Sequence, residues 1–235
     1  MSDPFGRAIR DHYRGEREAP LVDRDGERTR EHPIERWYFG EFEGDEWLES
    51  HLDGPLIDMG AGAGRDALYF QDRFETVAIE VSDRLVATMR DRGVVDARRA
   101  DMFSLPEQFE RDRFRSAYAR GTQVQLAGSM AGVERFLSDL AVVTAPDATA
   151  VIDGYAPERD ATADAFGYRE DPAPGLAYRV YHCVYEDEVG ETLLFRLFSP
   201  DRLRAAAVGT PWTVAEVRYP RSDRPVQWVV RLEKA

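Results

Sequence analysis

The sequence contains one cysteine, one lysine and four histidines, and it has no long hydrophobic run. The single cysteine, Cys183, excludes a disulfide within the chain and a cysteine-based zinc cluster, and we expect no metal site. No motif surrounds this residue, so we expect an ordinary thiol, buried or on a strand. No stretch reaches 18 apolar residues and the N-terminus is too polar for a secretory signal, which predicts no membrane association and a cytoplasmic location.

Lysine is almost absent, and arginine supplies nearly all of the positive charge. Of 31 basic residues, Lys234 is the single lysine and the remaining 30 are arginines, against 44 acidic residues and a net charge of −13. Such an acidic surface repels phosphate backbones and disfavours nucleic acid as a partner. The composition also indicates a salt-adapted protein, in which screening weakens this argument and leaves RNA open if a local basic patch exists.

Charge and aromatic content divide the chain into a first segment of about 50 residues and a larger remainder. The first segment is highly charged, with aromatic clusters near residues 5–13 and 37–47. Helical spacing relates Phe5, Ile9, His12 and Tyr13. A polar stretch with a turn signal at Asp25-Gly26 separates the two clusters. We predict that residues 1–50 form an N-terminal cap of short helices, and that the cluster Trp37–Phe39 is either cap core or a lid.

Residues 51–235 alternate between strand and helix patterns. Expected strand units lie at 55–60, 75–82, 94–106 with its loop, 114–123 and 148–157, with helices at 64–74, 82–93 and 131–145. This alternation is typical of an α/β fold with a Rossmann-like, doubly wound, mainly parallel sheet. An antiparallel hairpin is expected at about 178–198. A helix capped by Ser199 and two strands at 212–220 and 226–235, joined by the turn-like stretch 221–225, complete the chain.

The stretch "LIDMGAGAGRD" places three glycines where a buried strand passes into a helix. The strand ends at Asp58 and the helix begins near Gly64. Glycines at this junction permit a tight turn and allow a ligand to lie against the backbone, and the helix N-terminus favours an anionic group. The dinucleotide-binding fingerprint requires a third glycine where this chain has Arg65, which disfavours an NAD-linked enzyme.

Two acidic residues follow at the ends of the next strands. Glu80 lies about 20 residues beyond the first glycine, where a carboxylate can accept both hydroxyls of a ribose. Asp101 precedes Met102 and Phe103, so its carboxylate can accept from an adenine amine while the apolar neighbours cover the ring. The ordered set of glycines and strand-end carboxylates predicts a nucleoside-containing ligand.

These motifs resemble those of the class I S-adenosylmethionine-dependent methyltransferases, over residues 50–155 and again in the last helix and strand. The resemblance implies a seven-stranded sheet of order 3-2-1-4-5-7-6 with strand 7 antiparallel, S-adenosylmethionine as cofactor and S-adenosylhomocysteine as product. It also implies that the loop residues hold methionine and ribose, Asp58 supports the loop, Glu80 holds the ribose, and Asp101 with Met102 holds the adenine. The predicted cofactor-binding residues are Asp58, Gly60, Ala61, Gly62, Gly64, Glu80, Val81, Asp101, Met102 and Arg120.

The substrate motifs of the family are absent. The segment after the fourth strand reads "YARGTQVQ", without the Asn/Asp-Pro-Pro-aromatic motif of amino-group enzymes acting on nucleic acid or glutamine, and Cys183 lies far from the position of a cytosine C5 nucleophile. We therefore predict a methyltransferase for a small-molecule acceptor, with in-line transfer that relies mainly on positioning. The catalytic residues are left unassigned, and candidate bases are His12, His32, Tyr13, Tyr38, Arg120 and Gln123.

Three other functions remain open from the sequence. The first is a nucleotide-sugar or NAD-linked enzyme on a Rossmann-type sheet, and the second is a regulatory or scaffold protein that binds S-adenosylmethionine without activity. The third is an RNA-modifying methyltransferase. The hairpin at 178–198 is expected to act as a lid or as the surface of a homodimer.

Overall fold

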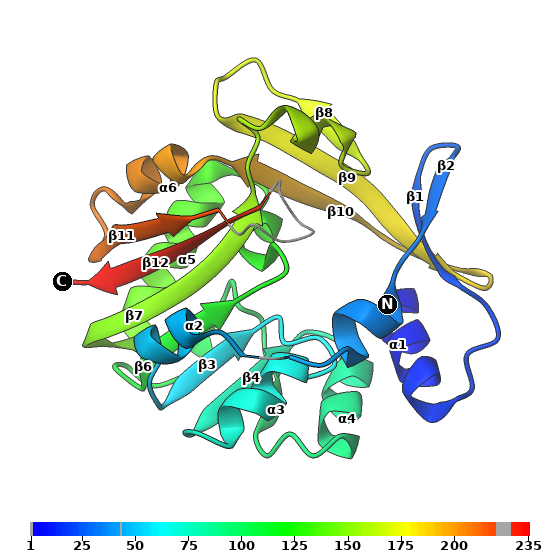
Figure 1. The fold of residues 1–235 in the computed structure, drawn as a ribbon, viewed down its shortest axis with the longest axis horizontal. Coiled ribbons are helices and arrows are strands. Elements are labelled where there is room, and N and C mark those ends of the chain that lie inside the picture. The colour runs from blue at the N-terminus through cyan, green and yellow to red at the C-terminus, as the bar shows by residue number, and fades with distance from the viewer. Residues whose placement is uncertain (1, 43, 220–226) are drawn as a thin grey trace.

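Seven strands form the larger sheet of the computed structural model, which describes residues 2–42, 44–219 and 227–235 (Figure 1). Their order across the sheet is β11-β12-β7-β6-β3-β4-β5. Starting from β5 and numbering the strands within this sheet, the order is 3-2-1-4-5-7-6. β3 to β7 are parallel, and β12 is antiparallel to both neighbours. The strands are β3 Leu56–Met59, β4 Thr76–Glu80, β5 Ala97–Arg99, β6 Phe114–Ala119, β7 Thr144–Tyr155, β11 Trp212–Arg218 and β12 Gln227–Lys234. The α/β, Rossmann-like fold is confirmed.

Helices cover both faces of this sheet. Leu48 of α2 and Phe70 of α3 pack against Tyr118 of β6 on one face. On the other face, Leu137 of α5 and Leu203 of α6 belong to a core that includes the inward residues of the parallel strands. The helices are α2 Glu46–His51, α3 Arg65–Gln71, α4 Asp83–Asp91, α5 Met130–Val143 and α6 Pro200–Ala207. Short 3₁₀ turns lie at Leu105–Glu107, Gln123–Ala127 and Asp160–Asp164.

Capping side chains fix the starts of two helices where the sequence predicted them. The Ser82 hydroxyl accepts from the backbone N–H of Leu85 at 3.2 Å, and the Ser199 hydroxyl accepts from that of Arg202 at 3.3 Å. Each hydroxyl satisfies an N–H group that the first turn of a helix leaves unpaired. None of the helices in the described ranges is long and apolar enough to cross a bilayer.

A second sheet of five strands lies across from the first and is built from two distant segments of the chain (Figure 1). β9 and β10 form the hairpin expected at 178–198, and β1 pairs with the free edge of β9. The strands are β1 Leu21–Asp25, β2 Arg28–Glu31, β8 Tyr168–Glu170, β9 Leu176–Tyr185 and β10 Glu188–Phe198. The predicted turn at 221–225 lies outside the described residues.

The N-terminal segment is only partly helical, which corrects the expectation that residues 1–50 form a cap of short helices. The polar stretch expected to link two helices contains β1 and β2, with the turn at Asp25-Gly26 confirmed between them. β1 pairs with β2 across this turn and, along its other edge, with β9, about 160 residues later. Because this pairing is non-local, nothing in the polar segment itself indicates a strand.

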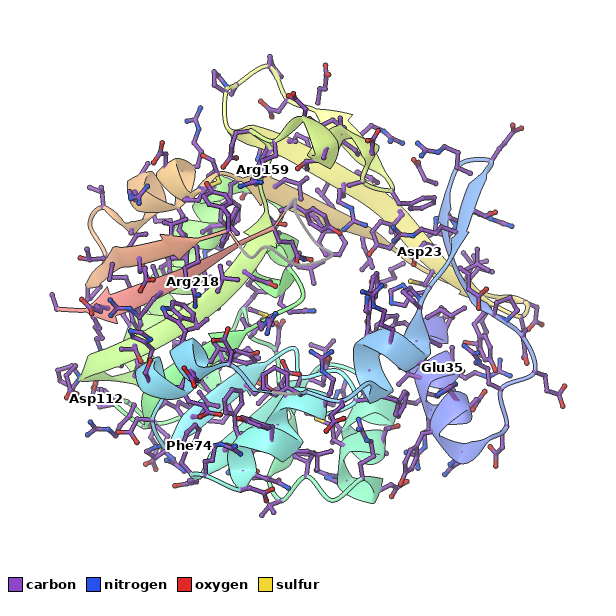
Figure 2. All side chains as sticks on the ribbon, in the orientation of Figure 1. Asp23, Glu35, Phe74, Asp112, Arg159 and Arg218 are labelled. Atoms are coloured by element: carbon purple, nitrogen blue, oxygen red, sulfur yellow. The ribbon has the colours of Figure 1, made fainter. Side chains whose placement is uncertain are left out.

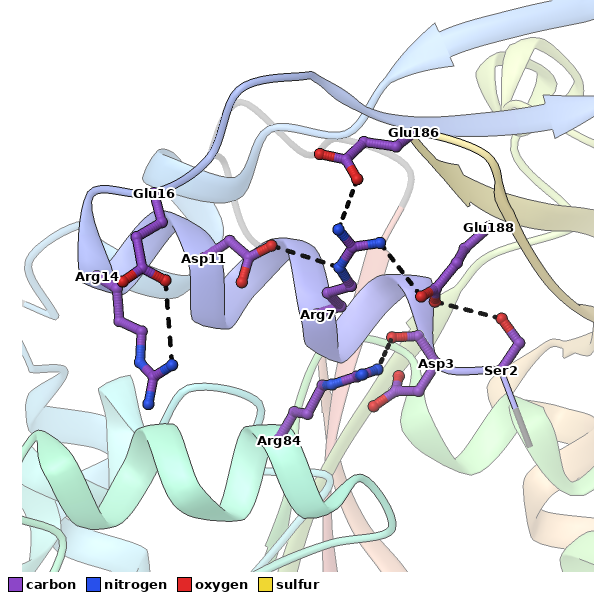
Figure 3. Close-up of polar contacts among 9 residues, drawn as sticks. All are labelled: Ser2, Asp3, Arg7, Asp11, Arg14, Glu16, Arg84, Glu186 and Glu188. Atoms are coloured by element: carbon purple, nitrogen blue, oxygen red, sulfur yellow. Dashed lines mark hydrogen bonds and ion pairs between the residues drawn. The ribbon is translucent and has the colours of Figure 1, made fainter.

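Helix α1, Pro4–Arg14, ties the second sheet to the first (Figure 3). The Asp3 carboxylate caps α1 by accepting from the Gly6 N–H at 2.8 Å, and it also accepts from the Ser82 hydroxyl at 2.5 Å. Arg7 forms ion pairs with Glu186 at 2.5 Å and with Glu188 at 3.2 Å, at the tip of the β9–β10 hairpin. Helix α1 therefore closes one side of the space between the sheets.

Candidate active site

A cavity of about 2090 Å³ lies between the carboxyl ends of β3, β4 and β6 and the inner face of β9 and β10. Figure 2 shows side chains of both sheets and of the N-terminal segment directed into this space. A pocket for a single small ligand is usually about 300–1,000 Å³. The cavity is therefore large enough for a cofactor and a second molecule together.

The glycine loop forms one wall of the cavity. Gly60 and Gly62 have φ angles of 72° and 60°, a left-handed conformation that glycine adopts without strain. A Cβ atom at Gly60 would lie 2.6 Å from the Gln123 side chain, and one at Gly62 would lie 3.0 Å from the Tyr38 ring. Ala61 lies between them and also lines the cavity. The loop therefore lines the cavity, with the Gln123 and Tyr38 side chains packed against its two glycines.

Gly64, which was predicted to contact the cofactor, does not line the cavity. A Cβ atom at this position would lie 2.6 Å from Val94 and 3.0 Å from Met89. Gly64 is the N-cap of α3 and allows this helix to pack closely against α4 and the chain that follows it. The lack of a side chain at position 64 is therefore explained by the close packing of α3 against α4 and the chain after it.

Asp58 lies beneath the loop with an unsatisfied carboxylate oxygen. The residue is 3% exposed and lines the cavity, and its Oδ2 is buried without a hydrogen-bond partner in the described part of the chain. Burial raises the pKa of Asp58 well above its usual value, and the neighbouring Asp66 and Glu80 raise it further. A buried carboxyl group of this kind is suited to a ligand that brings a positive charge or a hydrogen-bond donor.

Glu80 lies at the end of β4, directly beside the loop. Its carboxylate accepts from the N–H of Gly62 at 2.8 Å and from that of Val81 at 3.1 Å. Burial raises the pKa of Glu80 to about 7, although these two backbone hydrogen bonds lower it. Val81 presents an apolar side chain, 59% exposed, to the same cavity. Glu80 and Val81 thus provide a polar and an apolar surface side by side.

Arg120 and Gln123 reach the cavity from the segment after β6. Interaction with Tyr118 raises the pKa of Arg120 in spite of burial, and Asp153 and Asp66 raise it further, so the guanidinium stays charged. The Tyr118 hydroxyl in turn donates to Asp66 at 2.8 Å. Seven of the ten predicted cofactor-binding residues therefore line one cavity: Asp58, Gly60, Ala61, Gly62, Glu80, Val81 and Arg120.

Asp101 and Met102 do not line the cavity. The chain turns tightly after β5, so that the Asp101 carboxylate accepts from the backbone N–H of Phe103 at 2.9 Å. Met102 is 6% exposed and belongs to the core beneath the sheet. The structure therefore does not bring this predicted adenine site together with the glycine loop.

A chain of three hydrogen-bonded side chains ends above the glycine loop. His32 lies between Asp23 and Tyr38, with Nδ1 2.9 Å from Asp23 Oδ1 and Nε2 3.2 Å from the Tyr38 hydroxyl. Burial raises the pKa of Asp23, but hydrogen bonds from His32 and Arg30 outweigh it and the net shift is downward. Asp23 is therefore ionised and accepts the Nδ1 proton, and in the neutral form of His32 this leaves Nε2 to accept from Tyr38.

Cys183 lies beside this chain but is not a reactive group. Its sulfur is 3.6 Å from Asp23 Oδ1, and burial followed by the charge of Asp23 raises the pKa of the thiol. The residue is buried on β9, as expected from the sequence. A thiol in this setting is not a nucleophile at neutral pH.

Two of the candidate bases lie away from the cavity. His12 packs against Phe39 with ring centroids 4.8 Å apart, and the Tyr13 hydroxyl donates to the Asp91 carbonyl oxygen at 2.9 Å. Of the aromatic cluster at 37–39, Trp37 and Tyr38 line the cavity. His32, Tyr38, Arg120 and Gln123 remain as candidates from the original set.

Sequence reasoning missed Asp23 and Arg179. Nothing in "LVDRDGERTRE" distinguishes Asp23 from the other charged residues, because its environment is created by β9 and the histidine nine residues later. Arg179 carried a usable signal. Strand alternation in "LAYRVYHCVY" places it on the same face as the buried residues Ala177, Tyr181 and Cys183.

Solved structures with this fold are S-adenosylmethionine-dependent methyltransferases. One from Bacteroides fragilis, in complex with S-adenosyl-L-homocysteine, is 22% identical over 100% of this chain and 95% of its own, with a TM-score of 0.80. An amino pentose methyltransferase from Micromonospora echinaspora, bound to S-adenosylmethionine, is 17% identical over 77% of this chain and 83% of its own, with a TM-score of 0.56. No protein-family model and no curated protein sequence matches the chain.

A third similar structure is the 1,6-didemethyltoxoflavin-N1-methyltransferase of Burkholderia thailandensis, with 1,6-didemethyltoxoflavin and S-adenosylhomocysteine bound. It is 18% identical over 77% of this chain and 70% of its own, with a TM-score of 0.52. At these identities the comparisons establish the fold of the chain. The chain has the fold of the S-adenosylmethionine-dependent methyltransferases.

Proposed function

We propose that the protein is an S-adenosylmethionine-dependent methyltransferase that acts on a small-molecule acceptor. The observation that carries the proposal is the buried Asp58 Oδ2, which has no hydrogen-bond partner among the described residues and lies beside the glycine loop at the wall of the cavity. Similar folds in enzymes for an amino pentose and for 1,6-didemethyltoxoflavin support a small acceptor. We further propose that residues 51–235 form the cofactor-binding domain and residues 1–50 a lid on it.

The residues at the cavity fit the cofactor. Asp58 would pair with its ammonium group, and the backbone of the glycine loop would lie along its methionine portion. Glu80 would accept from the ribose hydroxyls, and Val81 would cover one face of the adenine. Arg120 would remain close to the methionine carboxylate. When bound, S-adenosylmethionine supplies an electrophilic methyl group on its sulfonium sulfur.

We propose that the chain of Asp23, His32 and Tyr38 takes up the proton that an acceptor hydroxyl or ammonium group must lose. Burial raises the pKa of Tyr38, so the phenol stays protonated and donates to His32 Nε2. A proton accepted by the Tyr38 oxygen can therefore be matched by transfer of the phenolic proton to His32. The histidine then becomes an imidazolium ion paired with Asp23, so the three side chains together hold the one proton that the acceptor has lost.

The shape of the site supports a small acceptor because the second sheet and the start of α1 form walls on the side opposite the glycine loop. His32 is held by edge-on contacts with Phe5 and Trp37, with ring centroids 5.5 and 4.9 Å away. These rings exclude water from the end of the cavity at which the proton chain lies. A homodimer formed through the β9–β10 hairpin, a cytoplasmic location and adaptation to high salt stay predictions from the sequence.

Isothermal titration with S-adenosylmethionine and S-adenosylhomocysteine, at low and at molar salt, tests the proposal. We expect both to bind with micromolar or better affinity. Absence of binding at both salt concentrations would contradict the proposed function. Titration with NAD under the same conditions separates this proposal from an NAD-linked enzyme, and we expect no heat of binding for NAD.

The affinity for S-adenosylhomocysteine is expected to rise with pH. Only the ionised Glu80 carboxylate accepts from both ribose hydroxyls, and its pKa of about 7 makes it mostly neutral at low pH. Raising the pH from 6 to 8 should therefore increase the affinity by roughly tenfold. The free energy of unfolding of the ligand-free protein should change in the opposite direction. Folded Glu80 keeps its proton up to about pH 7, whereas the unfolded chain loses it near pH 4.5, so stability falls as the pH rises between these values.

Titration calorimetry across this pH range, with two variants, checks the assignment to Glu80. Glu80→Gln should bind more weakly and with a flat pH profile. Glu191→Gln removes another carboxylate that lines the cavity and should keep the wild-type slope. A slope that persists in Glu80→Gln would assign the titration to a different group.

A further inference from the structure

Arg179 is a buried cation on a strand face that is otherwise apolar. It lies on β9 between Ala177 and Tyr181 in the inward register, is 4% exposed, and lines the cavity. Charged side chains are almost never buried to this degree unless they are paired. The position of Arg179 therefore requires a partner.

The described part of the chain supplies no carboxylate for this guanidinium. Its Nε donates to the Phe166 carbonyl oxygen at 2.8 Å, and no ion pair connects it to a described acidic residue. Arg196, a comparably buried arginine on β10, is by contrast paired with Asp171 at 2.7 Å. Arg179 lines the cavity, and its terminal amino groups form no hydrogen bond with a described residue.

Three aromatic rings hold the guanidinium in place. Its carbon lies 4.7 Å from the ring centroid of Tyr155, 5.1 Å from that of Tyr181 and 5.5 Å from that of Phe195. Cation–π contacts stabilise the charge but do not replace the hydrogen bonds that its N–H groups lose on burial. The cage thus orients Arg179 and leaves its charge to be neutralised by a ligand.

We propose that Arg179 binds a carboxylate group of the methyl acceptor, which makes the acceptor a small carboxylic acid with an apolar or aromatic body. This inference rests on the proposed function. The planar guanidinium matches a carboxylate through two parallel hydrogen bonds, and one cation balances the single negative charge. A phosphate would bring a charge of roughly −1.5 to −2 at pH 7. Leu193 and Phe195 provide the apolar wall beside it.

The site lies on the acceptor side of the cavity. The residues that fit the cofactor lie at the ends of β3 and β4, whereas Arg179 belongs to the opposite sheet. Tyr181, which contacts Arg179, belongs to a buried apolar cluster. Tyr38 packs against the same cluster. An acceptor held by Arg179 would therefore reach toward Tyr38, the end of the proposed proton chain.

Titration calorimetry with benzoate and with its neutral isostere benzamide, in the presence of saturating S-adenosylhomocysteine, tests this inference on the full chain. We expect benzoate to bind at least about tenfold more tightly than benzamide, the difference made by a hydrogen-bonded charge pair. Arg179→Met should abolish this preference, and Arg179→Lys should restore part of it. Arg84→Met removes a cationic side chain that donates to the Asp3 carbonyl oxygen at the cavity rim and should leave the preference unchanged.

Each outcome separates this inference from the proposed function. Equal binding of benzoate and benzamide, or no benzoate binding while S-adenosylhomocysteine binds, would overturn the carboxylate site and leave the proposed function standing. A tenfold or greater loss of S-adenosylhomocysteine affinity in Arg179→Met would also overturn the carboxylate site, because it would show that Arg179 binds the cofactor. Failure of the wild-type protein to bind S-adenosylhomocysteine would contradict the proposed function itself.

Discussion

Gly62→Val is expected to abolish binding of S-adenosylhomocysteine while the protein stays folded. A branched side chain at this position would enter the space between the loop and the Tyr38 ring, which lies 3.0 Å from where the Cβ atom would be. It would also occupy the surface along which the methionine portion of the ligand should lie. We expect a loss of affinity of at least about 100-fold, which corresponds to about 2.7 kcal/mol.

Gly26→Val is a matched control for this prediction. Gly26 has the same φ angle of 60°, and a Cβ atom there would meet nothing within 4 Å. The two variants therefore place valine at the same φ, but only the first fills the cavity. Calorimetric titration of both should give wild-type affinity for Gly26→Val alone. Wild-type affinity in Gly62→Val would show that the glycine loop is not the cofactor site.

Tyr38→Phe is expected to slow methyl transfer by about 10²- to 10⁴-fold, the usual contribution of a general acid or base. The substitution removes the hydroxyl that bonds to His32 Nε2 at 3.2 Å and keeps the ring that packs over Gly62. The affinity for S-adenosylhomocysteine should therefore stay within a few-fold of wild type. The rate is measured as label passing from methyl-labelled S-adenosylmethionine to the small-molecule fraction of a cell extract.

Two further variants sharpen this test. Asp23→Asn should also slow transfer, because a neutral amide cannot stabilise the imidazolium that His32 becomes. Tyr13→Phe removes a tyrosine hydroxyl that bonds to the Asp91 carbonyl oxygen, away from the cavity, and should keep the wild-type rate. An unchanged rate in Tyr38→Phe would show that the acceptor reacts without losing a proton to this chain.

The main sheet and the glycine loop at its edge could be predicted from the sequence because their signals are local. Asp58, Gly60 and Gly62 follow one another directly, and Glu80 ends the next strand of a regular βαβ unit. Parallel strands bring these ends to the same edge of the sheet, so the spacing alone predicts that they meet. Asp101 follows the same rule in sequence, but the turn after β5 directs its carboxylate to Phe103.

The other half of the cavity could not be predicted because it depends on contacts between distant segments. Asp23 lies beside Cys183 only because β1 pairs with β9, and His32 reaches Asp23 only through the β1–β2 hairpin. Arg179 was detectable in principle as a charge on an apolar strand face, but its cage comes from β7, β9 and β10 together. Local patterns therefore identified the glycine-loop side of the cavity and missed the side formed by the second sheet.

Direct measurement of methyl transfer tests the central claim of this account. The protein is incubated with methyl-labelled S-adenosylmethionine and the small-molecule fraction of a cell extract, with Gly62→Val as the blank. We predict a labelled small molecule and an equal amount of S-adenosylhomocysteine, both absent from the blank. S-Adenosylhomocysteine formation no faster than in the Gly62→Val blank, at low and at molar salt, would contradict the claim that the protein is a methyltransferase.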